Sequence, residues 1–132
     1  MDKDNELGPL ARKDLRDSVH EAVEKAIKGG AKLLCGGKIP EGKGYYYPAT
    51  VLADVTPDNC MFNEEIFGPV AMVIKARNEK QAIEIHNTKS IYGLGGGVFT
   101  KDEPKGEKIA RELDCGLAFV NRYKRMLSAC DS

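Results

Sequence analysis

The alternation of apolar runs and amphipathic segments in the C-terminal half constrains the fold most. Residues 70–74 are wholly apolar, as in strands that are covered on both faces. A helix is predicted over 78–87, a strand over 95–100, a helix starting near Pro104, and a last strand over 117–120. Strands joined through helices cross over with one hand and lie parallel. We therefore predict an α/β fold: a partial doubly wound parallel sheet with flanking helices.

Two of these helices carry sequence signals at their first turns. Asn78 and Gln81 have the spacing of a capping box, although Asn replaces the more usual Ser or Thr. Pro104 suits the first turn of a helix, where its missing N–H costs little. That helix is expected to bury three apolar residues, Ile109, Ala110 and Leu113.

The N-terminal half begins with a predicted amphipathic helix over residues 12–29. Its apolar residues fall on one face at helical spacing: Leu15, Val19, Ala22, Val23, Ala26 and Ile27. Gly29-Gly30 is expected to end the helix, because glycine readily adopts the left-handed conformation. A strand over 32–35, a turn-rich loop over 38–44 and an extended segment over 45–55 follow. The three tyrosines of that segment are expected to divide between core and surface.

Charge and hydropathy exclude several classes of partner. Twenty basic and twenty acidic residues give a formal net charge of zero. Binding to nucleic acid or to an anionic membrane would favour a basic excess, so neither is predicted as a partner. No apolar run approaches the roughly 20 residues of a membrane span. Residues 1–6 are polar and acidic, unlike a signal peptide, so we predict a cytoplasmic location.

The cysteines and histidines do not form a recognisable metal or disulfide pattern. Cys35, Cys60, Cys115 and Cys130 are irregularly spaced and include no C-x-x-C pair. A free-standing thiol enzyme using Cys35 or Cys115 is one reading, but no basic cluster flanks either residue. His20 and His86 are interpreted as ordinary core or surface residues. The glycines at 93 and 95–97 lack the lysine of a phosphate-binding loop and indicate close backbone packing.

The run Glu64-Glu65-Ile66-Phe67-Gly68-Pro69 allows two interpretations. It can be the lead-in to a strand, with exposed carboxylates, a buried Ile or Phe and a bend. It can also be a binding loop, because a Gly-Pro before a buried strand fixes the direction of the preceding side chains. Loops beside such strands are where α/β proteins place binding groups.

This run resembles the Glu-Glu-x-Phe-Gly-Pro motif of NAD(P)-dependent aldehyde dehydrogenases. The resemblance continues in order over residues 7–121 and looks most similar to the succinate-semialdehyde dehydrogenases. The further matching stretches are Gly8-Pro9-Leu10, Gly30-Ala31 with Gly36-Gly37, residues 47–52, Asn87, Tyr92-Gly93-Leu94, Val98-Phe99-Thr100 and Val120-Asn121. Residues 1–121 are thus expected to be a partial catalytic domain, and residues 122–132 a divergent tail.

The resemblance implies roles for three residues. Glu65 would accept hydrogen bonds from the nicotinamide ribose hydroxyls, and Phe67 would pack against the nicotinamide ring of NAD or NADP. Asn121 is a weaker candidate near the mouth of the substrate site. The complete enzyme would oxidise a small-molecule aldehyde, succinate semialdehyde in particular, to the carboxylic acid.

Two sequence contexts that the family needs for catalysis do not occur in these residues. The family's nucleophilic cysteine stands in a G-Q-x-C context and its general base in an E-L-G-G context. No catalytic residue is therefore assigned, and we expect the isolated chain to be inactive and to bind cofactor weakly or not at all. Bare strand edges predict a homo-oligomer. The alternative function is a non-enzymatic α/β interaction module that pairs with a separate chain.

Overall fold

The computed structural model describes residues 7–122 and divides the chain after Ala76 into two compact units. The first unit contains helix α1 (Lys13–Lys28) and strands β1 (Lys32–Cys35), β2 (Thr50–Ala53) and β3 (Val70–Met72). The second contains helix α2 (Glu79–Glu84), the π-helical turn η1 (Ile85–Lys89), strand β4 (Gly96–Val98), helix α3 (Glu103–Glu112) and strand β5 (Ala118–Val120). The predicted tail, 122–132, lies outside the described residues except for Arg122.

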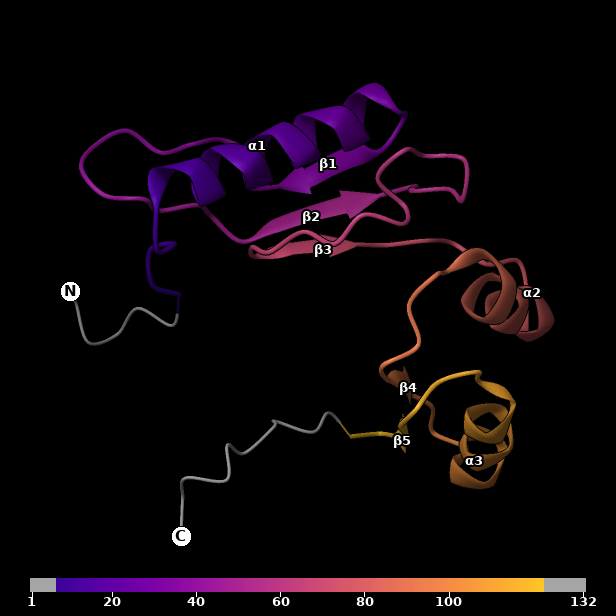
Figure 1. Cartoon of the computed structure of the whole chain (residues 1–132). Helices are drawn as coiled ribbons and strands as arrows, with labels where there is room; N and C mark the ends of the chain where they lie inside the picture. The colour runs from indigo at the N-terminus through magenta and orange to yellow at the C-terminus, as the bar shows by residue number, and fades with distance from the viewer. Residues whose placement is uncertain (1–6, 123–132) are drawn as a thin grey trace, which may run out of the picture. The chain divides into compact units, whose positions relative to one another are not determined.

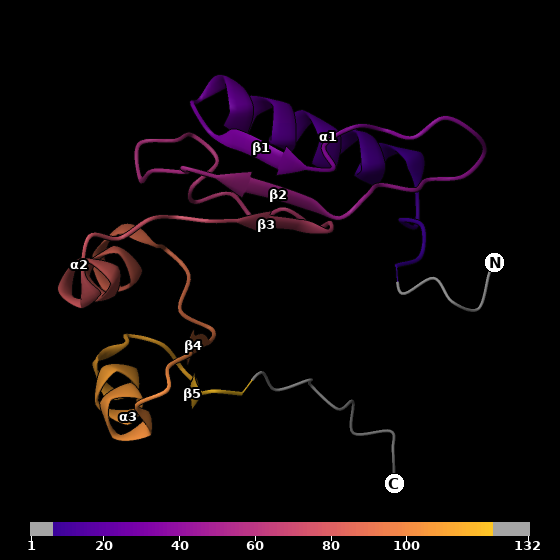
Figure 2. The same cartoon turned by 180° about the vertical axis from the view of Figure 1, so that it is seen from behind.

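Helix α1 covers one face of a three-stranded sheet in the first unit (Figure 1). The sheet order is β1-β2-β3, with β1 antiparallel and β3 parallel to the central strand β2. Figure 2 shows the same arrangement from behind, with the three strands side by side beneath the helix. The predicted helix over 12–29 and strand over 32–35 are confirmed to within one residue.

The core of the first unit forms where α1 meets β2. Val19, Val23 and Ala26 of α1 are buried, and they pack with Leu52 and Val55, which are also buried. The expected apolar face of the helix is therefore confirmed for these residues. Ile27 is an exception, because 38% of it is exposed at the last turn of the helix. The stripe had been expected to include it.

Gly30 and Asn59 make hydrogen bonds to the backbone at the C-terminal end of α1. Gly30 adopts a left-handed φ of 99°, and its N–H donates to the Ile27 carbonyl at 3.0 Å. The buried side chain of Asn59 donates from Nδ2 to the Ala26 carbonyl at 2.9 Å and accepts from the Met61 N–H at 3.0 Å. A distant loop thus satisfies a carbonyl in the last turn of the helix.

The tyrosines divide as expected, with one in the core and two on the surface. Tyr47 is 3% exposed, and its hydroxyl lies 3.1 Å from Nδ1 of His20, whereas Tyr45 and Tyr46 are exposed. Burial raises the pKa of the Tyr47 hydroxyl, and the negative charge of Glu24 adds to this effect.

In the second unit, both helices begin near the residues that the sequence indicated, Asn78 and Pro104. The Asn78 side chain accepts from the Gln81 N–H at 2.9 Å, and the Gln81 side chain accepts from the Arg77 N–H at 2.7 Å. Helix α3 has Pro104 in its first turn and is capped by Asp102, which accepts from the Lys105 N–H at 3.1 Å. The first of these helices continues as a π-helical turn to residue 89, two residues beyond the predicted end.

The sheet topology corrects one expectation while confirming the α/β class. Two crossover units had been predicted to join the strands after residue 69 into one sheet. The structure instead pairs β3 with β2, and β4 in parallel with β5, so among residues 7–122 only β4-α3-β5 is such a crossover. The expectation failed because the crossover rule applies to strands of one sheet, and sequence does not say which strands share a sheet.

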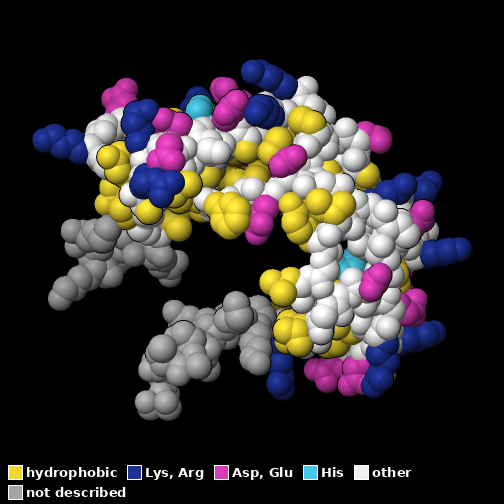
Figure 3. Space-filling view, viewed as in Figure 1, with side chains coloured by type: hydrophobic (Ala, Val, Ile, Leu, Met, Phe, Trp, Pro, Cys, Tyr) yellow, Lys and Arg dark blue, Asp and Glu magenta, His cyan; other side chains and the backbone are white. Residues whose placement is uncertain are grey.

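The apolar strands are also less covered than their composition predicted. Ala71 and Val73 in the third strand segment are exposed, and Leu117 beside β5 is 57% exposed. Ile109, Ala110 and Leu113 of the second unit are only half-buried. Figure 3 shows hydrophobic side chains at the surface of both units. The described residues therefore leave part of these apolar strands uncovered, as expected for a partial sheet.

We predict that Thr50→Val destabilises the first unit by about 1–3 kcal/mol. The buried Thr50 hydroxyl accepts from the Gly37 N–H and donates to the Pro48 carbonyl, each at 2.9 Å. Valine has the same shape but leaves both backbone groups unsatisfied. Urea unfolding followed by circular dichroism measures the change, with the exposed Thr56→Val as matched control. Equal stability of the two variants would contradict the prediction.

Candidate functional site

The motif at residues 64–69 is held against α1 by close packing. A Cβ built on Gly68 would lie 2.6 Å from Cγ2 of Val19, so no larger residue fits at this approach. The Thr50 N–H donates to the Pro69 carbonyl at 2.8 Å, which ties the end of the motif to the sheet. Ile66 packs against the buried core. The motif is therefore both a strand lead-in and a loop of fixed direction.

Glu65 and Phe67 point away from this anchor toward the surface. Both are exposed, and Phe67 keeps 73% of its surface accessible, while Ile66 between them packs inward. A phenylalanine that is exposed on a fixed backbone offers a flat ring for stacking. Both predicted cofactor contacts are thus exposed, and the chain turns at Phe67, where the Gly68 N–H donates to the Ile66 carbonyl at 2.8 Å.

A groove runs between α1 and the segment at residues 60–67. One hollow of about 370 Å³ and a smaller one of about 90 Å³ both include Glu65 in their walls. The α1 side of the larger hollow consists of Ser18, Glu21, Ala22 and Lys25. These residues were not singled out from sequence, although their spacing of three and four places them in one stripe of the helix.

The charges of the groove favour hydroxyl groups over phosphate groups. Glu21, Glu64 and Glu65 line the larger hollow, against a single cation, Lys25. Lys25 is itself paired with Glu21, with Nζ 3.2 Å from Oε1. Carboxylates accept hydrogen bonds from a diol and repel a pyrophosphate. The lining of the larger hollow therefore suits hydroxyl groups better than phosphate groups.

Asn121 lies in the second unit, where its side chain is already engaged. Its Oδ1 accepts from the Thr100 N–H and its Nδ2 donates to the Thr100 carbonyl, both at 2.8 Å. Its backbone has a left-handed φ of 51°, and its N–H donates to the Val98 carbonyl at 2.8 Å. Asn121 therefore joins the ends of β4 and β5. A substrate contact from its amide would compete with these bonds.

The side chain of Asn87 also joins two backbone segments of the second unit. This role was not predicted from the sequence. Its Nδ2 donates to the Glu112 carbonyl at 2.7 Å, and its Oδ1 accepts from the Asp114 N–H at 2.9 Å. The amide thereby joins the π-helical turn to the end of α3. An asparagine near a helix end can make such bonds, but the sequence does not show where its partners lie.

Cys35 and Cys115 are the two cysteines that the sequence offered as thiol candidates, and both lie within the described residues. Cys35 is exposed and Cys115 is half-buried, with its thiol 3.2 Å from the Leu117 carbonyl. Among residues 7–122, no group of three or more His, Cys, Asp or Glu side chains is placed to hold a metal ion. None of the helices in that range is long and apolar enough to cross a membrane.

Comparison with known proteins identifies the family. The model of the aldehyde dehydrogenase family matches residues 1–129. Succinate semialdehyde dehydrogenase [NAD(P)+] of Escherichia coli is 48% identical over 92% of this chain and 26% of its own length. An aldehyde dehydrogenase of Paenarthrobacter nicotinovorans is 45% identical over 92% of this chain and 26% of its own length.

Solved structures agree with the sequence match. Mycobacterium tuberculosis aldehyde dehydrogenase complexed with NAD+ aligns with a TM-score of 0.88 and 41% identity, covering 94% of this chain and 26% of its own. Succinic semialdehyde dehydrogenase from Streptococcus pyogenes in complex with NADP+ aligns with a TM-score of 0.88 and 33% identity over 95% of this chain and 27% of its own. The chain belongs to the aldehyde dehydrogenase family and spans about a quarter of the length of these relatives.

We predict that Gly68→Ala destabilises the first unit by about 1–3 kcal/mol, because the new methyl group overlaps the Val19 side chain. Urea unfolding measures the loss, and amide chemical shifts report displacement of residues 64–69. In a Val19→Ala background, which removes both overlapping methyl groups, the same change should cost clearly less. Additive effects of the two substitutions would contradict the proposed contact.

Proposed function

We propose that this chain provides the nicotinamide-facing part of an NAD(P)-dependent aldehyde dehydrogenase. The observation that carries the proposal is the pair Glu65 and Phe67, exposed beside a groove on a motif that Gly68 and Ile66 anchor to α1. A carboxylate for a ribose diol and an accessible aromatic ring for a flat cationic ring are the two contacts that this end of the cofactor needs.

The residues present fit one half of such a cofactor. When bound, the nicotinamide accepts a hydride from the substrate. Glu65 would orient the ring by holding the ribose, and Phe67 would shield one ring face from water. The acidic groove disfavours the pyrophosphate, so the other half needs residues outside this chain. Family membership does not decide whether the cofactor is NAD or NADP, because relatives in complex with either one align with this chain.

We further propose succinate semialdehyde as the substrate of the complete enzyme. Support comes from the relatives, because the E. coli protein and those of Mycobacterium ulcerans and Deinococcus radiodurans are named for that substrate. Asn121 remains a proposed substrate contact, with its amide also bonded to Thr100. The cytoplasmic location and the homo-oligomeric state likewise remain proposals.

A non-enzymatic interaction module is the second candidate, and the exposed apolar residues of the second unit favour it. Leu94 is 83% exposed, Ile91 71% and Phe99 69%. Exposed apolar side chains of this size commonly mark contact surfaces for another chain. The module reading and the enzyme reading differ in one respect: only the enzyme reading requires Glu65 to contact a nucleotide.

We predict that the isolated chain does not oxidise aldehydes and binds NAD+ or NADP+ with a dissociation constant above about 1 mM. It lacks the nucleophile and base contexts, and half a cofactor's contacts do not offset the cost of immobilising the whole ligand. Absorbance of the reduced cofactor with succinate semialdehyde measures turnover, and calorimetry measures binding. The full-length E. coli relative is the positive control. Turnover that is lost on Cys35→Ala or Cys115→Ala would contradict the prediction.

The role of Glu65 is testable in a chimera in which this chain replaces the matching segment of the E. coli relative. We predict an active chimera in which Glu65→Gln lowers kcat/KM for the cofactor by about 10–100-fold, the value of a lost charge-assisted hydrogen bond. Glu41→Gln, which changes an exposed carboxylate of the first unit that lines neither hollow, is the control and should change it less than about threefold. An active chimera in which both variants behave alike would refute the assignment.

A further inference from the structure

The buried side chain of Asn59 joins the two walls of the groove beside Glu65. One wall is α1 and the other is the segment at residues 60–67, and both contribute side chains to the larger hollow. Asn59 directly precedes that segment, and only 5% of it is exposed. Its Nδ2 donates to the Ala26 carbonyl of α1 at 2.9 Å, and its Oδ1 accepts from the Met61 N–H at 3.0 Å. One amide group is therefore bonded to both walls.

Backbone hydrogen bonds continue from Asn59 along the segment toward Glu65. The Phe62 N–H donates to the Asn59 carbonyl at 2.9 Å, and the Glu64 N–H donates to the Met61 carbonyl at 3.2 Å. The Met61 side chain is buried and belongs to the core of the first unit. Each tight turn fixes the backbone angles of its central residues, so little freedom remains between Asn59 and Glu64. The place of Asn59 on α1 therefore determines where this wall of the groove lies.

Gly29 lets the Asn59 side chain lie directly against the end of α1. A Cβ built on Gly29 would lie 2.8 Å from Nδ2 and 3.1 Å from Cγ of Asn59. Gly29 has a φ of −78° and a ψ of 8°, and a negative φ is open to residues other than glycine. The close approach of Asn59, and not the backbone conformation, therefore excludes a larger residue here. Contact with Gly29 and two hydrogen bonds together fix the amide.

The bond from Asn59 to Ala26 adds more than a partner for the helix end. The Ala26 carbonyl also accepts from the Ala31 N–H at 3.0 Å, so it keeps one hydrogen bond without Asn59. Burying an amide costs free energy unless its polar atoms are bonded, and an apolar side chain would fill the same place without that cost. What the amide supplies is geometry, because its two bonds fix the distance and the angle between α1 and the segment at residues 60–67.

We propose that Asn59 is a positioning residue for the nicotinamide ribose, an assignment that rests on the proposed function. Asn59 lines neither hollow, so it acts through the backbone of Met61 and Glu64 and not by touching the ligand. Its bond to α1 sets the width of the groove in which Glu65 would meet the ribose. Gly68 holds the motif after Glu65, and Asn59 holds the segment before it. Glu65 is thereby placed from both sides along the chain.

Steady-state kinetics of the chimera with the E. coli relative test the proposal. We expect Asn59→Ala to raise the KM for the cofactor about tenfold and to change kcat less than about twofold. The ribose contact is made equally in the ground state and in the transition state, so its misplacement weakens binding without slowing the chemical step. A role in stability alone has a different signature, because a smaller folded fraction lowers the apparent kcat and leaves KM unchanged.

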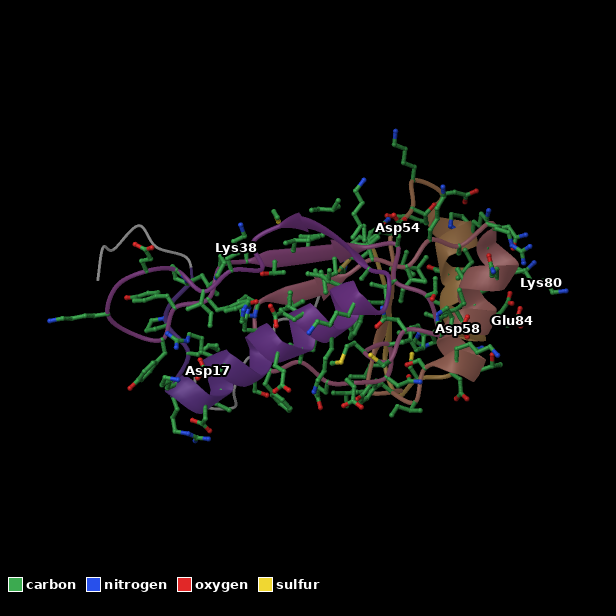
Figure 4. The ribbon with its side chains drawn as sticks, turned by 90° about the horizontal axis from the view of Figure 1, so that it is seen from above. Asp17, Lys38, Asp54, Asp58, Lys80 and Glu84 are labelled. Atoms are coloured by element: carbon green, nitrogen blue, oxygen red, sulfur yellow. The ribbon has the colours of Figure 1, made fainter. Side chains whose placement is uncertain are left out.

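Two further variants isolate the contact. Gly29→Ala pushes on the Asn59 amide while every hydrogen-bonding group is retained, so it gives the same test should Asn59→Ala not fold. It should raise KM at least about threefold, with no further rise in an Asn59→Ala background. Asp58→Ala is the matched control, since it truncates an exposed neighbour that lines neither hollow, and it should change KM less than about twofold. Figure 4 shows Asp58 beyond the C-terminal end of α1 and Asp17 near its other end.

Amide spectra of the full chain give a second measurement that does not depend on the cofactor. Asn59→Ala and Gly29→Ala should each shift the Glu64 and Glu65 amides in a folded chain, whereas Asp58→Ala should leave them in place. Unshifted amides in both folded variants, or a lowered kcat with an unchanged KM, overturn the proposal. A chimera in which Glu65→Gln has no effect overturns the proposed function instead, and the two failures are therefore distinguishable.

Discussion

The contact between Val19 of α1 and the backbone at Gly68 sets the position of everything proposed for the first unit. Because Gly68 has no side chain, the chain passes directly over the helix and enters β3 in parallel register with β2. Ile66 is drawn into the core by the same approach, which leaves Glu65 and Phe67 on the outer side. Core packing and the direction of two binding side chains therefore have one cause.

Sequence reasoning succeeded where a single local pattern decides the structure. The 3.6-residue spacing of apolar residues located α1, and Asn78 and Pro104 indicated where α2 and α3 begin. The sequence left the motif at 64–69 open between a strand lead-in and a binding loop, and the structure adds the close approach of Gly68 to Val19. Its meaning as a nucleotide contact came from family resemblance, because acidic pairs and aromatic residues before a strand are also common where no ligand binds.

The sequence did not predict which distant segments contact or hydrogen-bond to one another. The buried bonds of Thr50 to Gly37 and Pro48, and of Asn59 to Ala26, depend on the route of the chain between them. The pairing of β3 with β2 was not predicted. Apolar composition indicates that a strand can be buried, but it does not show which strand pairs with it. The exposure of Ala71, Val73 and Leu117 agrees with the expectation that a partial sheet leaves apolar strand surface uncovered.

The two units differ in how much of their apolar surface they bury for themselves. Among residues 7–122, the eight buried hydrophobic residues all belong to the first unit: Val19, Val23, Ala26, Ala31, Tyr47, Leu52, Val55 and Met61. Among the described residues of the second unit, only Gly106 is buried, under Thr100 and Val120. Burial is the main favourable term in folding, so the second unit has the smaller reserve of stability. Glu65 and Phe67 consequently stand on the unit with the larger buried core, whereas Asn121 stands on the unit with the smaller one.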